Sequence, residues 1–359
     1  MNAERLQVDV LVVGLGPAGS SAAAVAASRG LSVLGIDRKA ELGIPVQCAE
    51  YIPLPIARHA QANGVMKQAV SVMQTYSSSA SVQSMVPGLI VDRARFDQAL
   101  AHRAREAGAE LRANTRLQRL LPRSRSARIQ QGDTPFEIEY RILIAADGPR
   151  SEVARSLGLS SLKVIASYQR QLELRQSNDA TQVWLDERFP GGYAWLFPRG
   201  KRANLGVAGF TQEAARLKHN LSSLHRQLEQ EGCVTGRVLS STGGPIPVQG
   251  IRDTLVEGNI LFAGDAAGLC HPITGAGIAM AIDSGECAAE ASADHLETGS
   301  SLSVYESEMR TRYESSLRHA SSRRNRLEQL WHSNEYERPG ALRGTWVAFA
   351  EYFEERDDC

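Results

Sequence analysis

Long apolar runs and an excess of charge are both missing from this sequence. The longest apolar run, VDVLVVGLG near the start, is too short to span a bilayer and is interrupted by glycine. It also lacks the basic flank and the cleavage site of a signal peptide. The 40 basic residues are balanced by 40 acidic ones, so no global field attracts nucleic acid. We therefore expect a cytoplasmic protein without a transmembrane segment or a nucleic-acid partner, a composition that still allows peripheral contact with a membrane.

The sequence has few cysteines, and they are widely spread. The chain has 5 cysteines and no CxxC pair, which excludes a zinc ribbon or a thioredoxin-type motif and disfavours a disulfide framework. No cluster of metal ligands and no Ser-His-Asp arrangement stands out, so we expect no metal site. The cysteines are Cys48, Cys233, Cys270, Cys287 and Cys359. Only Cys48 lies in a loop-like, proline-containing segment, GIPVQCAEYIP at 43–53.

The first forty residues have the clearest pattern. With 359 residues and 43% hydrophobic content, the chain can form two packed lobes or one large α/β domain with an insertion. The apolar run at 8–13 predicts a strand buried on both faces of a parallel sheet. A small-residue helix is expected at 20–28, followed by a second strand at 33–36 that ends at Asp37.

The rest of the chain changes its pattern twice. Residues 88–112 predict a short strand and an amphipathic helix, and residues 140–159 predict an apolar strand, a turn and a helix. Between 160 and 250, short alternating strands predict an antiparallel sheet with one exposed face, interrupted by a polar helical insertion at 211–232. Residues 259–292 return to a strand, a Gly-rich loop and a long helix, so the chain comes back to its first domain.

A Gly-rich turn with GxGxxG spacing joins the first strand to the first helix. In this motif the first glycine makes the tight turn, the second lets the backbone approach a pyrophosphate, and the third lets helix and strand pack closely. The helix N-terminus offers N–H groups to phosphates, and an acid at the end of the second strand accepts hydrogen bonds from a ribose. The alternative is a tight turn without a ligand. The predicted site comprises Gly14, Gly16, Pro17, Ala18, Gly19, Asp37 and Arg38.

Three later stretches favour FAD over NAD as the dinucleotide. NILFAGDAAG at 259–268 places an acid after a strand and a glycine, where a flavin needs its ribityl chain and second phosphate held. PITGAGI at 272–278 begins a helix whose N-terminal N–H groups can face the flavin, and ADGPRS at 146–151 ends a strand and closes over the cofactor. These motifs add Asp147, Gly148, Gly264, Asp265, Gly275, Ala276, Gly277 and Ile278 to the expected FAD site.

The motifs together carry a family resemblance. GLGPAG, ADGPRS and FAGDAAGLCHPITGAGI resemble the flavoprotein group that includes aromatic hydroxylases of the p-hydroxybenzoate hydroxylase fold, flavin-dependent halogenases and geranylgeranyl reductases. PGGYAWLFP at 190–198 fits the P-x-x-Y-x-W-x-F-P pattern of the geranylgeranyl reductase family at every fixed position. PVQCAE at 45–50 is similar to that family's P-x-x-C-G-E loop, with Ala49 where glycine is common. The resemblance covers roughly residues 1–300.

The resemblance implies an α/β fold with three parts. These are a Rossmann-like FAD-binding domain, an antiparallel β-sheet substrate or cap domain, and C-terminal helices. The FAD-binding domain is expected at 1–75, 88–160 and 250–300, the sheet domain at 76–87 and 161–249, and the helical region at 301–359.

Four residues are candidates for catalysis, and each has a structural alternative. Tyr193 and Trp195 share one face of a strand with Phe197, so they form either a floor for an apolar substrate or the core of the second lobe. His271 either relays a proton or hydrogen-bonds to the backbone. Cys48 is expected beside FAD, where it shapes the site and steers proton delivery. The alternatives are covalent catalysis and a packing role.

Two further residues flank these candidates. Arg93, at a strand-to-helix corner, matches the position from which this fold sends an arginine to FAD; otherwise it faces solvent. Cys270, next to His271, is expected to point into the core.

The resemblance leaves three chemistries open. Reduced FAD can reduce an isolated double bond, it can react with oxygen in a monooxygenase, or it can pass electrons to a protein partner, as in lipoate or peptide-derived quinone maturation. Halogenation is disfavoured because Lys67 lies in no matching context. No second GxGxxG follows, so NAD(P)H docks transiently or ferredoxin supplies the electrons. We predict a reductase, whose electron acceptor is a small apolar substrate or a redox partner protein.

The composition of the C-terminal residues bears on the choice between a prenyl substrate and a protein partner. After residue 300 the chain is rich in charge, and a closed tunnel for a C20 chain is harder to build from it than from the longer prenyl reductases. Trp331 and Tyr336 are expected to be exposed on a basic helical surface, which is either a partner site or simply a solvated face.

Overall fold

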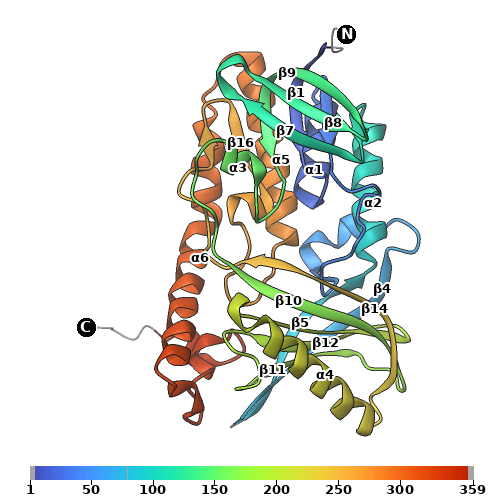
Figure 1. Cartoon of the computed structure of the whole chain (residues 1–359), viewed down its shortest axis with the longest axis vertical. Coiled ribbons are helices and arrows are strands. Elements are labelled where there is room, and N and C mark those ends of the chain that lie inside the picture. Colours follow the sequence, from blue (N-terminus) through green and yellow to red (C-terminus); the bar gives the residue numbers. More distant parts are fainter. Residues whose placement is uncertain (1–4, 79, 355–359) are drawn as a thin grey trace.

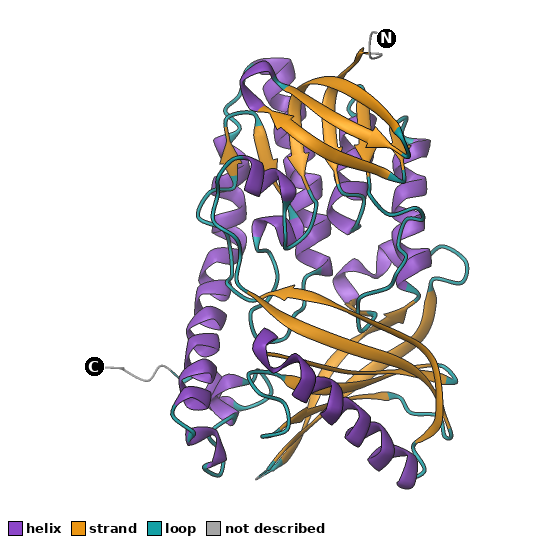
Figure 2. Ribbon diagram, in the orientation of Figure 1, coloured by secondary structure: helices purple, strands orange, loops and turns teal. Residues whose placement is uncertain are grey.

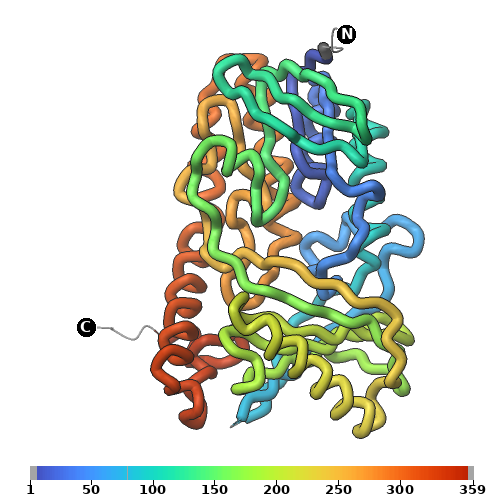
Figure 3. The backbone as a smooth tube through the Cα atoms, in the orientation of Figure 1, coloured from blue at the N-terminus to red at the C-terminus, as the bar shows by residue number. Residues whose placement is uncertain are grey.

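The protein has two halves, each built on one β-sheet. The computed structural model describes residues 5–78 and 80–354. Figure 1 shows one sheet with its flanking helices in the upper half and the second sheet in the lower half. Figure 3 shows that the chain passes back and forth between the halves, and the long helix α6 (Ser303–His332) runs beside both.

Sheet A, in the upper half, is parallel around its centre. Strand β1 pairs in parallel with β2 and β9, and its last four residues, Val10–Val13, are buried, because helices cover the sheet (Figure 2). The order is β15-β16-β9-β1-β2-β6, and a hairpin, β7 and β8, pairs onto β9. Its strands are β1 Arg5–Val13, β2 Val33–Ile36, β6 Glu110–Arg112, β7 Thr115–Leu121, β8 Ser126–Gln131, β9 Thr134–Ala145, β15 Val256–Glu257 and β16 Ile260–Phe262.

Small residues let the helices pack closely on one another and on sheet A. A Cβ added at Gly285 of α5 would lie 2.1 Å from the Ala18 carbonyl oxygen of α1, so only glycine permits this approach. No described helix is long and apolar enough to cross a membrane. Besides α6, the α-helices are α1 Pro17–Ser28, α2 Arg93–Glu106, α3 Glu152–Ser156, α4 Ala214–Gln230 and α5 Ile278–Thr298. The 3₁₀ turns are η1 Leu54–Ala60, η2 Pro122–Ser124, η3 Thr211–Glu213, η4 Gly264–Ala267, η5 Glu335–Glu337, η6 Arg343–Thr345 and η7 Ala350–Tyr352.

Sheet B forms the lower half in the order β14-β10-β13-β12-β11-β4-β5-β3. All of its pairings are antiparallel except that of β11 with β4, which come from separate excursions of the chain. Its strands are β3 Tyr51–Pro53, β4 Met66–Ser77, β5 Ser81–Val91, β10 Val164–Leu174, β11 Ala180–Leu185, β12 Tyr193–Arg199, β13 Arg202–Gly209 and β14 Val234–Pro247.

The sheets divide the chain differently from the expected boundaries at one place. Residues 51–91 supply β3, β4 and β5 of sheet B, whereas only 76–87 were expected there. The expectation of one exposed face is wrong for the central strands, since every residue from Tyr193 to Pro198 in β12 is buried. The apolar stripe of α4, which includes Leu217, Leu221 and Leu224, covers one face.

The C-terminal segment covers the other face of sheet B. Trp346, Phe349 and Tyr352 are 3%, 2% and 3% exposed, and they pack in one cluster with the aromatic side chains of β12. The charged composition after residue 300 concealed this short apolar stretch. The expected exposure of Trp331 and Tyr336 is also wrong, because their rings stack at 3.8 Å and both are half-buried.

Candidate functional site

The Gly-rich turn forms a narrow cradle at the carboxyl end of β1. Gly14 has a φ of +94°, and a Cβ there would lie 2.3 Å from the carbonyl oxygen of Ala146. A Cβ at Gly19 would lie 1.8 Å from the carbonyl oxygen of Gly14. At Gly16, by contrast, no described atom lies within 4 Å of the Cβ position. Backbone atoms therefore crowd the turn at Gly14 and Gly19, whereas the space beside Gly16 is open. A phosphate can approach the backbone there.

Asp37 faces this turn from the end of β2. Its Oδ2 accepts a hydrogen bond from Leu15 N–H at 2.8 Å, and its Oδ1 accepts one from Lys39 N–H at 2.8 Å. Each carboxylate oxygen keeps a further lone pair for a ribose hydroxyl. Arg38 is exposed beside it. No described side chain caps the N-terminus of α1, whose first turn also has no acidic residue, so its N–H groups are available to an anion.

The turn after β9 holds a buried carboxyl group. Asp147 Oδ2 accepts hydrogen bonds from Glu152 N–H at 2.7 Å and from Val153 N–H at 3.1 Å. Its Oδ1 is buried without a partner among the described residues, and burial raises the pKa of Asp147 despite the hydrogen bonds. Gly148 follows with a φ of +85° and open space at its Cβ position. An orphaned acceptor here fits a ligand that brings a donor.

The loop 271–278 leads into α5 and is fixed by its own backbone. His271 N–H donates to Ala276 O at 2.9 Å, and Gly275 N–H donates to His271 O at 2.9 Å. Gly275 has a φ of +69°. Gly277 and Ile278 begin α5, whose N-terminus has no described side-chain cap and no acidic residue in its first turn. This second free helix N-terminus can face an electron-rich ring edge.

Charged and sulfur-containing side chains meet between these loops. Burial raises the pKa of Asp265 to about 6, although Arg93 opposes the shift. Burial alone would lower the pKa of Arg93, but Asp97 and Cys48 outweigh it and raise the pKa. Arg93 Nε lies 3.1 Å from Asp97 Oδ1. Cys270 is buried, and its thiol pKa is raised by burial and then by Asp265 and Cys48. The expected Cys48, Arg93 and Asp265 therefore share one electrostatic environment.

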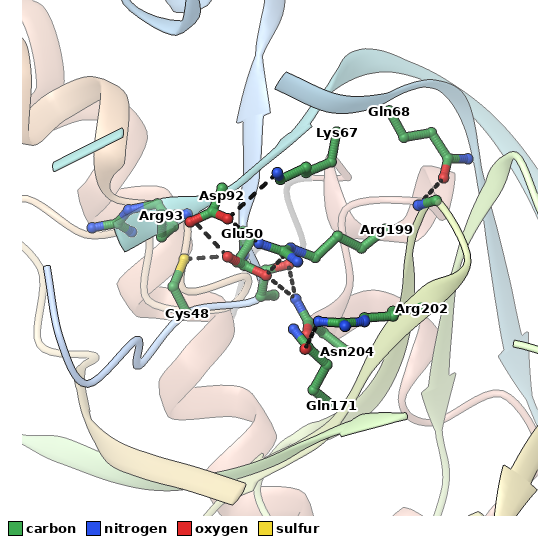
Figure 4. A network of polar contacts seen from close by, with 12 residues as sticks. Cys48, Glu50, Lys67, Gln68, Asp92, Arg93, Gln171, Arg199, Arg202 and Asn204 are labelled. Carbon is green, nitrogen blue, oxygen red and sulfur yellow. Dashed lines mark hydrogen bonds and ion pairs between the residues drawn. The ribbon is translucent and has the colours of Figure 1, made fainter. Parts of the chain in front are cut away.

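Cys48 is half-buried in the loop before β3 and is held at two atoms. Its Sγ accepts the N–H of Glu50 at 3.2 Å, and its carbonyl oxygen accepts the side-chain amide of Gln169 at 2.9 Å. Figure 4 shows Cys48 beside Arg93 and Glu50. The four described cysteines are free thiols, and Cys359 lies outside the described residues.

The aromatic residues of β12 use their polar ends to hold loops. Tyr193 OH donates to Thr274 O of the loop 271–278, and burial raises the pKa of Tyr193. Trp195 Nε1 donates to Gln169 Oε1 at 3.1 Å. Their rings and that of Phe197 face the apolar cluster completed by the C-terminal segment. The rings therefore form part of the core of the second lobe, and their role as a floor for an apolar substrate stays a prediction.

His271 is placed as an acceptor for the backbone. Its Nδ1 accepts the N–H groups of Ile273 and Thr274 at 3.3 and 3.2 Å, and its Nε2 lies 3.4 Å from Tyr352 OH. Burial lowers the pKa of His271 to about 4, with His319 adding to the shift. The ring is therefore neutral at physiological pH, which fits the backbone-bonding alternative; proton relay by His271 stays a prediction.

Several polar residues at the site were not foreseen. Glu50 stands in the recognised P-x-x-C-G-E pattern, and Arg199 follows the P-x-x-Y-x-W-x-F-P pattern directly, so both had a local signal that was not used. Gln169 lies among other polar residues of β10, where nothing in the sequence distinguishes it, whereas Asn204 is a lone amide between apolar residues of β13, a signal that was not used. All four contact the Cys48 loop or one another.

The residues present fit FAD. The cradle at Gly14 and Gly16, the acid Asp37, the orphaned Asp147 Oδ1 and the free N-termini of α1 and α5 together offer donors and acceptors for a dinucleotide with a fused ring. Arg93 supplies a buried positive charge between them. FAD is the group that satisfies this set.

Comparison with known proteins agrees with this geometry. Residues 54–320 match the family model for an FAD binding domain. Digeranylgeranylglycerophospholipid reductase 2 of Methanopyrus kandleri is 36% identical over 323 residues, covering 81% of this chain and 78% of that protein. The corresponding reductase of Methanosarcina acetivorans is 33% identical over 311 residues, covering 81% and 76%.

A solved structure extends the likeness to the fold. A geranylgeranyl bacteriochlorophyll reductase-like protein of Thermoplasma acidophilum superposes with a TM-score of 0.83 at 28% identity, over 92% of this chain and 91% of that one. The expected α/β architecture with an FAD-binding fold and C-terminal helices is thereby confirmed. The chain is an FAD-dependent oxidoreductase and belongs to the geranylgeranyl reductase family.

Proposed function

We propose that this protein reduces isolated carbon–carbon double bonds in a prenyl-bearing, apolar substrate. The observation that carries the proposal is the buried apolar face of β12, which is tied to the loop 271–278 by Tyr193 OH and to the Cys48 loop by Trp195 through Gln169. Reductases named for digeranylgeranylglycerophospholipid are similar over most of the chain. A prenyl chain has the shape and polarity that such a face accepts.

We propose that the two sheets bind different molecules. Sheet A and its helices hold FAD through Gly14, Gly16, Asp37, Asp147 and the N-terminus of α5. Sheet B receives the substrate on the face that the C-terminal segment, residues 341–354, covers in this structure. A cavity of about 10 Å³ lies among Tyr193, Ile273 and Trp346, which is room for one water, so a prenyl chain takes the place of the C-terminal aromatic rings.

FAD, when bound and reduced, would supply a hydride for one carbon of the double bond. The chain must deliver a proton to the other carbon, and we propose that Cys48 Sγ holds it. The sulfur accepts the Glu50 N–H at 3.2 Å and neighbours the Arg93 guanidinium, which stabilises the thiolate left after proton transfer until solvent returns the proton. Addition of one hydride and one proton balances the saturation of one double bond.

The test uses the flavin-loaded protein without oxygen. Dithionite reduces the flavin, a digeranylgeranyl phospholipid is added, and the lipid is analysed by mass spectrometry. We expect a gain of one H₂ per reduced double bond and reoxidation of the flavin at the same rate. Unchanged lipid with a flavin that stays reduced contradicts the proposal, and an oxygenated lipid formed only in air supports a monooxygenase instead.

The electron donor is tested separately. NADH, NADPH or reduced ferredoxin is added to the oxidised protein under nitrogen, and bleaching of the flavin band is followed. We expect one of these donors to reduce the flavin. If none does while dithionite succeeds, a dedicated protein donor is required.

A further inference from the structure

The Cys48 loop is tied to sheet B through a relay that begins at Trp195. The indole Nε1 of Trp195 donates to Gln169 Oε1 at 3.1 Å, and Gln169 Nε2 donates to the Cys48 carbonyl oxygen at 2.9 Å. Gln169 is 7% exposed, and both ends of its amide are engaged in this relay. A strand of sheet B thus fixes the backbone of the loop at the cysteine itself.

A second tie runs through Glu50, which is 2% exposed. Its Oε2 accepts from Asn204 Nδ2 at 2.7 Å and lies 2.9 Å from Arg199 Nε, while its Oε1 accepts from Arg93 N–H at 3.0 Å. Its own backbone N–H donates to Cys48 Sγ at 3.2 Å. One residue therefore connects sheet B, the first turn of α2 and the sulfur, as Figure 4 shows.

The charges around Glu50 are balanced. Arg199 Nη2 lies 2.6 Å from Asp92 Oδ2, and Lys67 Nζ lies 3.6 Å from the same oxygen. Burial alone would raise the pKa of Asp92, but the Arg95 N–H, Arg199 and Lys67 outweigh it and lower the pKa. Two carboxylates thus face two cations in a largely buried network, and removal of one charge leaves another unpaired.

The backbone at Glu50 is also strained. Its φ is +72°, in the left-handed region that residues other than glycine rarely adopt. Such a conformation persists only when surrounding contacts determine it, and strained backbone of this kind concentrates at functional sites. The contacts of the Glu50 carboxylate supply that constraint.

We propose that Glu50 and Gln169 are positioning residues that fix the Cys48 sulfur at the reaction site, and that Trp195 acts on this sulfur through Gln169. This rests on the proposed role of Cys48. It assigns the tryptophan of the P-x-x-Y-x-W-x-F-P pattern a task in orienting the cysteine of the P-x-x-C-A-E loop. The two sequence patterns then act together to orient the Cys48 sulfur.

The first test measures the thiol directly and needs no turnover. FAD-loaded protein is treated with iodoacetamide, and alkylation of Cys48 is followed by peptide mass spectrometry, with half-buried Cys233 as the internal reference. In Glu50→Gln and Gln169→Leu we expect Cys48 to react about tenfold faster, the change that loss of a hydrogen bond to a charged group or a fixed loop produces. Cys233 should react at the wild-type rate.

The control is Gln171→Leu on the same strand. Gln171 accepts from Arg202 Nη1 at 3.2 Å and makes no hydrogen bond to the loop among the described residues, so Cys48 should keep its wild-type rate. An unchanged Cys48 rate in Glu50→Gln and Gln169→Leu overturns the proposal. A parallel rise of Cys48 and Cys233 also overturns it, since that indicates general loosening of the fold.

The second test addresses the relay. Trp195→Phe keeps a ring in the cluster but removes the N–H that orients Gln169. We expect faster Cys48 alkylation in Trp195→Phe, and the double variant with Gln169→Leu should react no faster than Gln169→Leu alone. Additive effects would show that Trp195 does not act through Gln169. If prenyl reduction is observed, the single variants should lower kcat with little change in KM; a pure rise in KM assigns these residues to substrate binding and overturns positioning.

Discussion

The two halves of the molecule build their sites by different means. In the sheet A half the cradle is made mainly of backbone, at Gly14, Gly16 and the uncapped N-termini of α1 and α5. In the sheet B half the site depends on side chains that reach across the fold, such as Gln169 and Asn204 to the Cys48 loop. Backbone sites impose a local spacing of glycines, whereas side-chain ties require only that distant residues meet.

The halves also bury different kinds of surface. Strand β1 is covered by helices, and its core residues are aliphatic. The face of β12 is covered by three aromatic residues of the C-terminal segment, so its burial depends on contacts between residues far apart in sequence. A change in the first half should therefore disturb the cofactor, and a change in the second should disturb substrate or stability while FAD stays bound.

Gly14→Val is expected to have the largest effect. A Cβ would lie 2.3 Å from Ala146 O, and a β-branched residue is strongly disfavoured at a φ of +94°. We expect the purified protein to contain almost no flavin, as judged by its visible absorption, and to unfold at a much lower temperature. Gly16→Ala is the control, because its Cβ meets no described atom within 4 Å. It should keep the stability of the flavin-free protein and weaken FAD binding only. A yellow, stable Gly14→Val protein would contradict the cradle.

Trp346→Ala tests the second half and should have the next largest effect. Trp346 is 3% exposed and its ring lies 4.7 Å from that of Tyr193. Loss of such a side chain should lower the free energy of unfolding by about 3–5 kcal/mol in urea titrations, with the flavin content unchanged. Trp346→Phe is the matched variant. Because Trp346 Nε1 is buried without a described partner, this change should cost far less. Loss of flavin from Trp346→Ala would show that the halves do not act separately.

The contrast between the halves also explains what could be read from the sequence. The strand at 33–36, the turn at Gly14 and the helix after Gly277 follow from local patterns, and the structure has them at those places. The placement of 51–91 in sheet B was missed, because β4 pairs with β11 from a distant part of the chain. Gln169 was missed for the same reason: its partner in the Cys48 loop is 121 residues away, and no local periodicity records such a contact. Glu50, by contrast, stands within the PVQCAE pattern, and only its distant contact with Asn204 could not be predicted locally.

Asp265→Asn should have the smallest of these effects and has a defined pH dependence. Burial raises the pKa of Asp265 to about 6 in the folded state, above the value of 3.8 for a free side chain. The folded protein therefore binds more protons than the unfolded chain between these values, and the stability of flavin-free protein falls as pH rises through this window. Above pH 6 the carboxylate costs at most about 2–3 kcal/mol.

Asparagine removes this cost because it carries no charge. We expect flavin-free Asp265→Asn to melt at a higher temperature than the wild type at pH 7, with the difference shrinking as the pH is lowered from 7 to 4.5. Asp253→Asn, a carboxyl close in sequence but outside the site, serves as the control and should show no such trend. If the stability difference between Asp265→Asn and the wild type does not change with pH, Asp265 is already neutral or fully solvated. Its carboxylate is then not a buried charge that FAD binding would stabilise. The carboxylates of the sheet A site would then be those of Asp37 and Asp147.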